Sequence, residues 1–291
     1  MAKSFGTPAA FKQALEARLK KAADARGVPV NSLRLKFVIE RLLARLFAKP
    51  SPPWLLKGGY ALELRYRPKA RTTTDIDLTV KEAGDAALMQ RLDAIRDELQ
   101  DAADADLGDF LEFRIGASCG ELPGPPEGGS RFPVEALLAG RNYGRFHIDV
   151  GFGDAVIGDP EILAGDDFLS FVGIAPAKAI AIPRAQQFAE KLHAYTYPWT
   201  DRPNTRTKDL VDMLLLIEKG LAPDDELRRA IHATFDTRKR QAVPHDLVVP
   251  PDSWQEDFAA MAREVDLSTS DITLGFNNLT DFWRKVRNKN R

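Results

Sequence analysis

The chain has 291 residues, and its 41 lysines and arginines nearly balance 42 aspartates and glutamates, giving a formal net charge of −1. Hydrophobic residues make up 44% of the chain and charged residues 29%, which excludes a generally disordered protein. The near-zero charge also excludes a uniformly basic nucleic-acid binder, so any contact with nucleic acid must use local basic clusters. At this length we expect one large domain or two modest ones.

The sequence also indicates a compartment. A single cysteine, Cys119, excludes an intrachain disulfide and a cysteine-based zinc site. Residues 1–21 lack the apolar segment of a secretory signal. The most apolar stretch, residues 168–183, is too short to span a bilayer. We therefore expect a cytoplasmic protein without a membrane partner.

Two helices are predicted at the beginning of the chain. Apolar side chains at helical spacing predict a helix over residues 9–26, which Gly27 ends. A second helix is predicted to about residue 48, with Asn31 or Ser32 as its cap. Three prolines then follow, so residues 1–50 are expected to form a separate helical element.

From Trp54 onward the periodicity changes to that of an α/β core. A short helix is predicted over residues 60–67 and a longer one over residues 84–104. Alternating apolar residues predict strands over residues 54–57, 75–80, 109–116, 131–140 and 145–153.

After Pro183 the pattern is helical again, and it predicts helices over residues 184–197, 206–219, 224–238, 253–264 and 271–288. The order of elements predicts a bilobed α/β (α+β) protein with a mixed sheet. Its expected divisions are the N-terminal helices (1–50), the α/β core (51–183) and a helical C-terminal lobe (184–291).

Residues 57–80 carry the residue types of a phosphate and metal site. A strand runs into Gly58-Gly59, where glycines allow close backbone approach and a helix N-terminus can point its N–H groups at an anion. Asp75 and Asp77 alternate on the following strand and so share a face. Paired carboxylates suit Mg²⁺ or Mn²⁺ completed by substrate phosphates, and this combination predicts phosphoryl or nucleotidyl transfer.

A later strand carries a third acid, Asp149, between Ile148 and Val150. An acid between two apolar neighbours faces away from them. If this strand lies beside the strand of Asp75 and Asp77, Asp149 completes a three-carboxylate site. It would then act as a metal ligand or as the base that deprotonates an attacking hydroxyl.

Three blocks of the sequence carry a family resemblance: residues 57–78, residues 145–154, and residues 186–195 followed by 206–216. Their pattern resembles the DNA polymerase β nucleotidyltransferase superfamily. More narrowly, it resembles the AbiEii/AbiGii (MenT-type) nucleotidyltransferase toxins of bacterial toxin–antitoxin systems. The resemblance implies a polymerase β-like core that transfers an NMP from an NTP, with Mg²⁺, onto RNA. In several relatives the acceptor is the 3′ end of tRNA, whose modification blocks translation. It also implies a cognate antitoxin encoded nearby, and we expect a monomer when the protein is free.

By the same resemblance, Asp75 and Asp77 bind metal, Lys191 is a catalytic or NTP-contacting lysine, and Asp209 is a further functional acid. The residue pattern agrees, because Lys191 lies off the apolar stripe of its helix. Asp209 can pair with it across two helices and hold the ammonium where phosphate charge develops. Four residues are expected to contact the NTP phosphates: Lys57, Gly58, Gly59 and Arg71.

Local basic clusters can contact RNA phosphates despite the balanced total charge. The candidates are Arg202, Arg206, Lys208, Arg238, Lys239 and Arg240. The alternative is that these basic residues belong to an ordinary solvated surface and bind no RNA. Phosphorylation in the run Thr72–Thr74 would place negative charge against the metal site and is a possible way to silence the protein.

Two other readings of the same core remain. The acceptor could be a protein hydroxyl or a small molecule instead of RNA. The chain could also be a non-catalytic module that binds RNA or a partner, although the presence of Asp75, Asp77, Lys191 and Asp209 argues against a decayed site.

Overall fold

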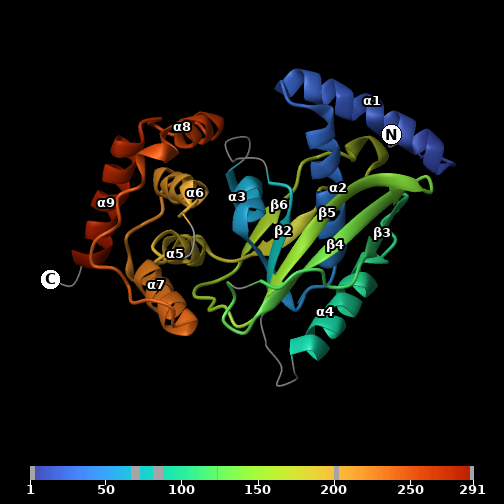
Figure 1. Ribbon diagram of the computed structural model, residues 1–291. Helices are drawn as coiled ribbons and strands as arrows, with labels where there is room; N and C mark the ends of the chain where they lie inside the picture. Colours follow the sequence, from blue (N-terminus) through green and yellow to red (C-terminus); the bar gives the residue numbers. More distant parts are fainter. Residues whose placement is uncertain (1–3, 67–72, 81–87, 123, 200–202, 289–291) are drawn as a thin grey trace. The chain divides into compact units, whose positions relative to one another are not determined.

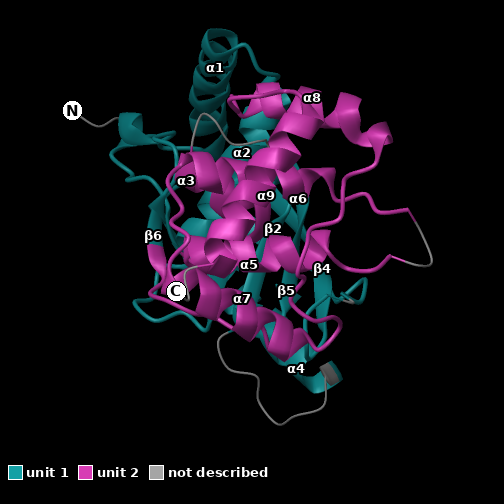
Figure 2. Ribbon diagram, turned by 90° about the vertical axis from the view of Figure 1, so that its left-hand side faces the viewer, with its two compact units in different colours: residues 1–56, 74–152, 162–180 teal, residues 57–73, 153–161, 181–291 magenta. Residues whose placement is uncertain are grey.

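The computed structural model describes residues 4–66, 73–80, 88–122, 124–199 and 203–288 (Figure 1). The chain forms two compact units, each made of several segments (Figure 2). Unit 1 comprises residues 1–56, 74–152 and 162–180, and unit 2 comprises residues 57–73, 153–161 and 181–291. These interleaved units divide the chain in a different way from the three consecutive ranges expected from the sequence. The division into three ranges stays a prediction.

Most of unit 1 is built on a sheet that has seven strands among the described residues. The antiparallel pairs β3–β4 and β4–β5 adjoin the parallel pair β5–β2, so the sheet is mixed, as predicted. In spatial order the strands are β3 (Leu111–Ile115), β4 (Gly129–Leu138), β5 (Arg141–Gly151), β2 (Ile76–Val80), β1 (Trp54–Lys57), β7 (Lys178–Ala181) and β6 (Glu161–Ala164).

The five strands predicted between residues 54 and 153 are confirmed. Strands β6 and β7 were not predicted. Each has only four residues, and β7 lies in the stretch 168–183, where Pro176 and Pro183 interrupt the pattern. Four residues contain too few alternations to show a period of two, so these strands depend on their neighbours in the sheet.

The helices of unit 1 are α1 (Pro8–Arg26), α2 (Val30–Leu46) and α4 (Leu88–Ala103), with a 3₁₀ turn at Ser170–Val172. Gly27 ends α1 with a left-handed φ of 66°, as predicted. The prediction of Asn31 or Ser32 as the cap of α2 is wrong. The helix begins after Pro29, and the Asn31 side chain accepts a hydrogen bond from Arg34 instead of from the backbone.

The two faces of the sheet in unit 1 differ in polarity. Alternate residues such as Ile76, Ile148 and Phe132 are buried, and α2 contacts β5 while α4 contacts β3 and β4 (Figure 1). The intervening residues carry the polar side chains. Because the side-chain period of a strand is two residues, burial of the apolar face determines which side chains point to the polar face.

An ion cluster ties α2 to the beginning of β3. Asp109 is 0% exposed and binds Arg41 and Arg45, each at 2.6 Å. Burial by itself would raise the pKa of Asp109, but hydrogen bonds and charge from the two arginines outweigh it and lower the pKa. The carboxylate therefore stays ionised inside the unit.

The helices of unit 2 are α3 (Gly58–Tyr66), α5 (Arg184–Tyr195), α6 (Thr207–Glu218), α7 (Asp225–Arg238), α8 (Gln255–Glu264) and α9 (Ile272–Asn288), with a 3₁₀ turn at Asp252–Trp254. Helix α5 packs against α6 and α7, and α6 packs against α8 and α9. Phe188, Leu214 and Phe258 are among the buried residues of this core. The helical series predicted after Pro183 is confirmed.

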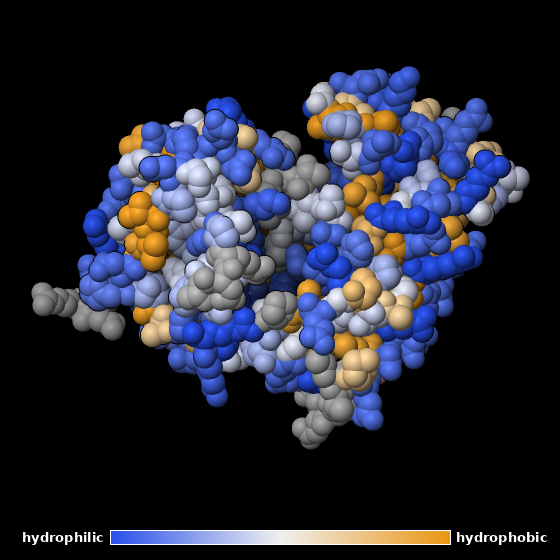
Figure 3. All heavy atoms as spheres, viewed as in Figure 1, coloured by the Kyte–Doolittle hydropathy of each residue, from blue (hydrophilic) through white to orange (hydrophobic). Residues whose placement is uncertain are grey.

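Figure 3 shows a mainly hydrophilic face of the molecule with scattered hydrophobic patches. No helix in the described parts of the chain has the length and apolar character needed to cross a bilayer.

The cluster at Asp109 gives a stability prediction. Asp109→Asn leaves Arg41 and Arg45 buried without a counter-charge, and we expect it to lower the free energy of unfolding by about 3 kcal/mol. The matched control is Asp97→Asn, which removes the carboxylate of a surface pair with Arg96 whose aspartate side chain is 68% exposed. That change should cost about 0.5 kcal/mol or less. Urea unfolding followed by circular dichroism measures both, and equal losses would contradict the prediction.

Candidate functional site

The carboxylates of unit 1 lie on the polar face of its sheet. Strand β2 pairs with β5 in parallel, and the register sets Asp77 opposite Asp149. On either side of this pair, Ile76 lies opposite Ile148 and Leu78 opposite Val150, and all four are buried. The adjacency on which the three-carboxylate prediction depended is therefore present.

Asp75 precedes β2 and lies at the more open end of the group. Its side chain is half-buried, and its Oδ1 is 3.5 Å from Nδ1 of His147. His147 lies two residues before Asp149 on β5 and so projects from the same face. A cavity of about 730 Å³ adjoins Asp75, with Thr74, Pro133 and His147 among its lining residues.

Arg131 of β4 is a residue of this site that the sequence did not reveal. It lies opposite Asp149 in the antiparallel β4–β5 pair, with its Nε 2.7 Å from Oδ1 and its Nη2 2.7 Å from Oδ2. The hydrogen bonds to Asp149 raise the pKa of Arg131, and the charges of Asp149, Asp75 and Asp77 act in the same direction. Asp149 of β5 thus lies between the carboxylate of Asp77 on β2 and the guanidinium of Arg131 on β4.

A short irregularity in the ladder sets the partner of Arg131, and the alternation of residues in β4 does not reveal it. Beyond the β4–β5 turn, Leu137 pairs with Asn142, but Ala136 pairs with Gly144, because the ladder contains a bulge. Counting back from the turn without this bulge would set Arg131 opposite Ile148. One extra residue reverses the face to which every later side chain points.

The carboxylates can be compared with the needs of a divalent metal ion. Asp75 and Asp77 share a face, as Mg²⁺ bound by one or two carboxylates plus water and phosphate requires. The described residues contain no group of three or more Asp, Glu, His or Cys side chains that could hold a metal ion. Both oxygens of Asp149 accept hydrogen bonds from Arg131. Asp75 and Asp77 therefore fit a metal ion, whereas Asp149 is committed to Arg131.

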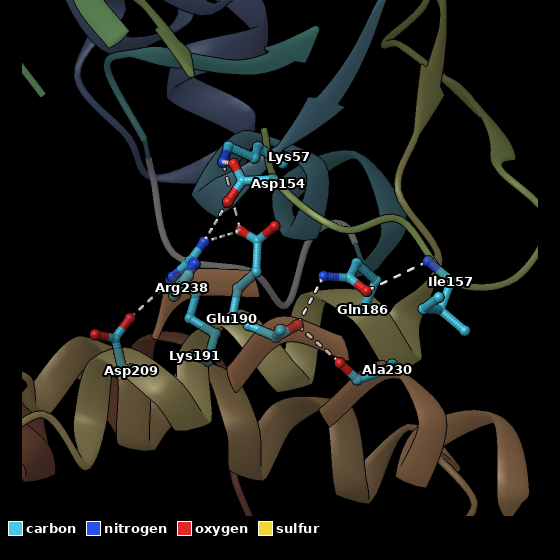
Figure 4. A network of polar contacts seen from close by, with 10 residues as sticks. Lys57, Asp154, Ile157, Gln186, Glu190, Lys191, Asp209, Ala230 and Arg238 are labelled. Atoms are coloured by element: carbon cyan, nitrogen blue, oxygen red, sulfur yellow. Dashed lines mark hydrogen bonds and ion pairs between the residues drawn. The ribbon is translucent and has the colours of Figure 1, made fainter. Parts of the chain in front are cut away.

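In unit 2, Lys191 of α5 is close to two acids of α6, of which Figure 4 shows Asp209. Its Nζ is 2.9 Å from Oδ1 of Asp209 and 2.7 Å from Oδ2 of Asp212, and all three side chains are largely buried. The predicted pair between Lys191 and Asp209 is present. Asp212, three residues further along the same helix, holds the ammonium equally closely.

A second cluster of unit 2 contains Lys57, Asp154, Glu190 and Arg238 (Figure 4). Lys57 binds Asp154, Arg238 lies 2.7 Å from Asp154, and both cations lie 3.7 Å from Glu190. Asp154 is 1% exposed, and although burial acts to raise its pKa, Lys57 and Arg238 lower it to about 2. The two cations are thus compensated inside the unit. Arg238 does not contribute to an exposed RNA-contacting cluster, and Lys57 is held by acids of the same unit.

The remaining predicted positions of unit 2 lie as follows. Gly58 begins α3 with a φ of 65°, which favours glycine, and its carbonyl accepts a hydrogen bond from Gln187 at 2.6 Å. Gly59 is buried in the first turn of α3. Arg206 is partly exposed, with its guanidinium 5.1 Å from the centre of the Trp199 ring and 3.5 Å from Asp209.

Three of the predicted RNA-contact residues, Lys208, Lys239 and Arg240, are exposed. The predicted residues Arg71, Thr72 and Arg202 lie outside the described residues.

Known proteins provide an independent comparison. A family model described as "Nucleotidyl transferase AbiEii toxin, Type IV TA system" matches residues 41–288. The structure of the nucleotidyltransferase toxin MenT4 from Mycobacterium tuberculosis H37Rv is similar at a TM-score of 0.59 and 17% identity, over 93% of this chain and 92% of that chain. An antigenic nucleotidyltransferase-like protein from Paracoccidioides brasiliensis is similar at a TM-score of 0.37 and 16% identity, over 71% and 89% of the two chains. No curated protein matches the chain.

The similarity to MenT4 extends over nearly the whole of both chains and confirms the predicted α/β fold class. The family match covers the residue blocks on which the predicted resemblance was based.

His193, two residues after Lys191 on α5, gives a prediction for acid stability. The side chain is buried against Phe235, with 4.9 Å between ring centres, and its Nε2 has no hydrogen-bond partner among the described residues. Burial, aided by the charges of Arg238 and Arg240 and opposed by Asp154, lowers the pKa of His193 to about 4. The unfolded chain, with a histidine pKa of about 6.5, therefore binds a proton that the folded chain excludes.

We expect stability to fall as the pH is lowered from about 6.5 to about 4, and His193→Phe to flatten this part of the profile. Thermal unfolding across this pH range measures the effect. The exposed His232 on α7 provides the control, His232→Asn. A slope unchanged by His193→Phe, or removed equally by the control, would contradict the assignment.

Proposed function

The chain belongs to the AbiEii family of nucleotidyl transferase toxins of type IV toxin–antitoxin systems, and from this premise we propose that it transfers an NMP from an NTP onto RNA. The proposed acceptor is the 3′ end of tRNA, whose modification blocks translation. The observation that carries the proposal is the parallel pairing of β2 and β5, which groups Asp75, Asp77 and Asp149 on the polar face of one sheet.

In this proposal Asp75 and Asp77 hold Mg²⁺ or Mn²⁺. When bound, such an ion neutralises charge on the phosphates during transfer. Gly58 and Gly59 at the beginning of α3 supply backbone N–H groups for an anion. The cavity beside Asp75 offers space for a part of the substrate.

Lys191 is proposed to stabilise the phosphate charge that develops during transfer. Asp209 and Asp212 fix the position of the ammonium, since its Nζ lies less than 3 Å from an oxygen of each. A preorganised cation of this kind needs little rearrangement when charge develops. Asp209 also holds Arg206, so its removal should disturb two cations.

The acceptor is proposed to be RNA because unit 2 exposes separate basic residues. Lys208, Lys239 and Arg240 can contact backbone phosphates. Trp199, already in contact with Arg206, can stack on an unpaired base. From the sequence, Arg202 belongs to the same RNA surface, and Arg71 belongs with the NTP phosphates.

Membership of the family implies a cognate antitoxin. We propose that it is encoded nearby, that the toxin acts in the cytoplasm and that it is monomeric when free. Phosphorylation in the run Thr72–Thr74 remains a proposed means of inactivation, because Thr74 immediately precedes Asp75 and a phosphate there would add charge of the same sign.

Radiolabelled nucleotides test the activity. Each of the four α-labelled NTPs is incubated with the protein, Mg²⁺ and either total RNA or a protein extract. Label in RNA supports the proposal, label in protein or in a small molecule supports another acceptor, and retained RNA binding without NTP turnover supports a non-catalytic module.

Two variants test the assigned residues. Asp77→Asn removes a carboxylate of the proposed metal pair, and Lys191→Met removes the proposed charge on α5. We expect each to lower NMP transfer by about 100-fold or more. The controls are Asp97→Asn in unit 1 and Asp281→Asn in unit 2, whose acids form exposed ion pairs. Transfer at the control rate in either site variant would contradict its assigned role.

A further inference from the structure

The proposed function gives no role to Arg131, although its guanidinium lies among the site carboxylates of unit 1. We propose that Asp149 is the positioning residue for Arg131, not a metal ligand, and that Arg131 binds the phosphate groups of the nucleotide beside the ion held by Asp75 and Asp77. This inference rests on the proposed function, since the anion it names is a triphosphate.

The geometry of Asp149 is the first reason. Each of its oxygens accepts a hydrogen bond of 2.7 Å from a different nitrogen of Arg131, which is the bidentate arrangement that arginine and carboxylate form most strongly. The Asp149 side chain is only 13% exposed. To ligate a metal ion it would have to give up these bonds in a partly desolvated position, where hydrogen bonds to charged groups are costly to lose.

Charge is the second reason. Asp75, Asp77 and Asp149 together carry three negative charges, and Arg131 carries one positive charge. Arg131 therefore compensates Asp149, the carboxylate to which it is bound. Ligation of the ion by Asp149 as well would leave Arg131 without the carboxylate that compensates it.

The third reason is the capacity of Arg131 for another ligand. A guanidinium has five N–H donors, and the two bonds to Asp149 use two of them. The side chain is 41% exposed, so an anion can approach it from solvent. A planar donor group fixed by a carboxylate is suited to phosphate oxygens, which it can bind through two parallel hydrogen bonds.

Another cross-strand ion pair on the same two strands has a different setting. Arg145 of β5 contacts Glu135 of β4 at 2.9 Å, but that arginine side chain is mostly exposed. Glu135 lies opposite Arg145 in the ladder, and β2 places no carboxylate pair in that row. The pair of Arg131 and Asp149 instead continues the row of Asp77 across three strands.

The test measures ligand binding, so it does not depend on turnover. Mn²⁺ affinity of the full chain is measured by electron paramagnetic resonance without nucleotide, and affinity for inorganic tripolyphosphate is measured by calorimetry with Mn²⁺ present. The variants are Asp77→Asn, Asp149→Asn, Arg131→Ala and Arg131→Lys. Arg26→Ala is the matched control, because it removes an exposed arginine that pairs with Asp166 in the same unit.

We expect Asp77→Asn to weaken Mn²⁺ binding by about tenfold or more, and Asp149→Asn to change it by less than about threefold. Arg131→Ala and Asp149→Asn should each weaken tripolyphosphate binding by about tenfold, because both remove the fixed guanidinium. Their double variant should bind no more weakly than Arg131→Ala alone, since the acid acts through the arginine. Arg131→Lys keeps the charge without the planar donors and should give an intermediate loss.

Loss of Mn²⁺ binding in Asp149→Asn equal to that in Asp77→Asn would show that Asp149 is a ligand and would overturn the inference. So would unchanged tripolyphosphate binding in both Arg131 variants when circular dichroism shows them folded. In either case NMP transfer by the unaltered protein would leave the proposed function standing. A protein that binds neither Mn²⁺ nor tripolyphosphate would overturn both.

Discussion

The register between β2 and β5 is the constraint on which the carboxylate site depends. Ile76 opposite Ile148 and Leu78 opposite Val150 place four apolar side chains in the core, and Asp77 and Asp149 must then face the other way. A slip of one residue would bury the acids and expose the apolar residues, at a cost far larger than any single contact on the polar face. The hydrophobic side of the sheet therefore positions the acids, and the site needs no stabilising contribution from the acids themselves.

Unit 2 positions its charges in a different way, by burying them with partners. Lys191 is held by Asp209 and Asp212, and Lys57 and Arg238 are held by Asp154 and Glu190. Buried pairs contribute little net stability, because desolvation offsets most of their attraction, but removing one member leaves an uncompensated charge. Such pairs fix the place of a charged side chain. For Lys191 this is the property that a phosphate-binding amine requires.

The parts of the fold that follow from short-range patterns could be predicted from the sequence. The helices after Pro183, the alternation in residues 75–80 and the shared face of Asp75 and Asp77 are of this kind. The partners of Lys57 and Arg238 could not be predicted, since Asp154 lies 97 residues from one and 84 from the other. Both residues look like candidates for phosphate or RNA contact until these acids are placed. Arg131 was missed for another reason, because the bulge between β4 and β5 shifts the register and so changes which residue of β5 lies opposite it.

The mixed character of the sheet gives β5 its particular role. Its parallel neighbour β2 contributes an acid opposite Asp149, and its antiparallel neighbour β4 contributes a base opposite the same residue. Like charges in adjacent strands repel, whereas opposite charges attract, so Asp149 is drawn toward Arg131 and away from Asp77. The result is a row across three strands, formed by Asp77 on β2, Asp149 on β5 and Arg131 on β4. Asp149 lies between the other two and binds Arg131. Under the proposed function, the acid end of this row holds the cation and the basic end the anion, and a nucleotide bound with a metal ion presents both charges.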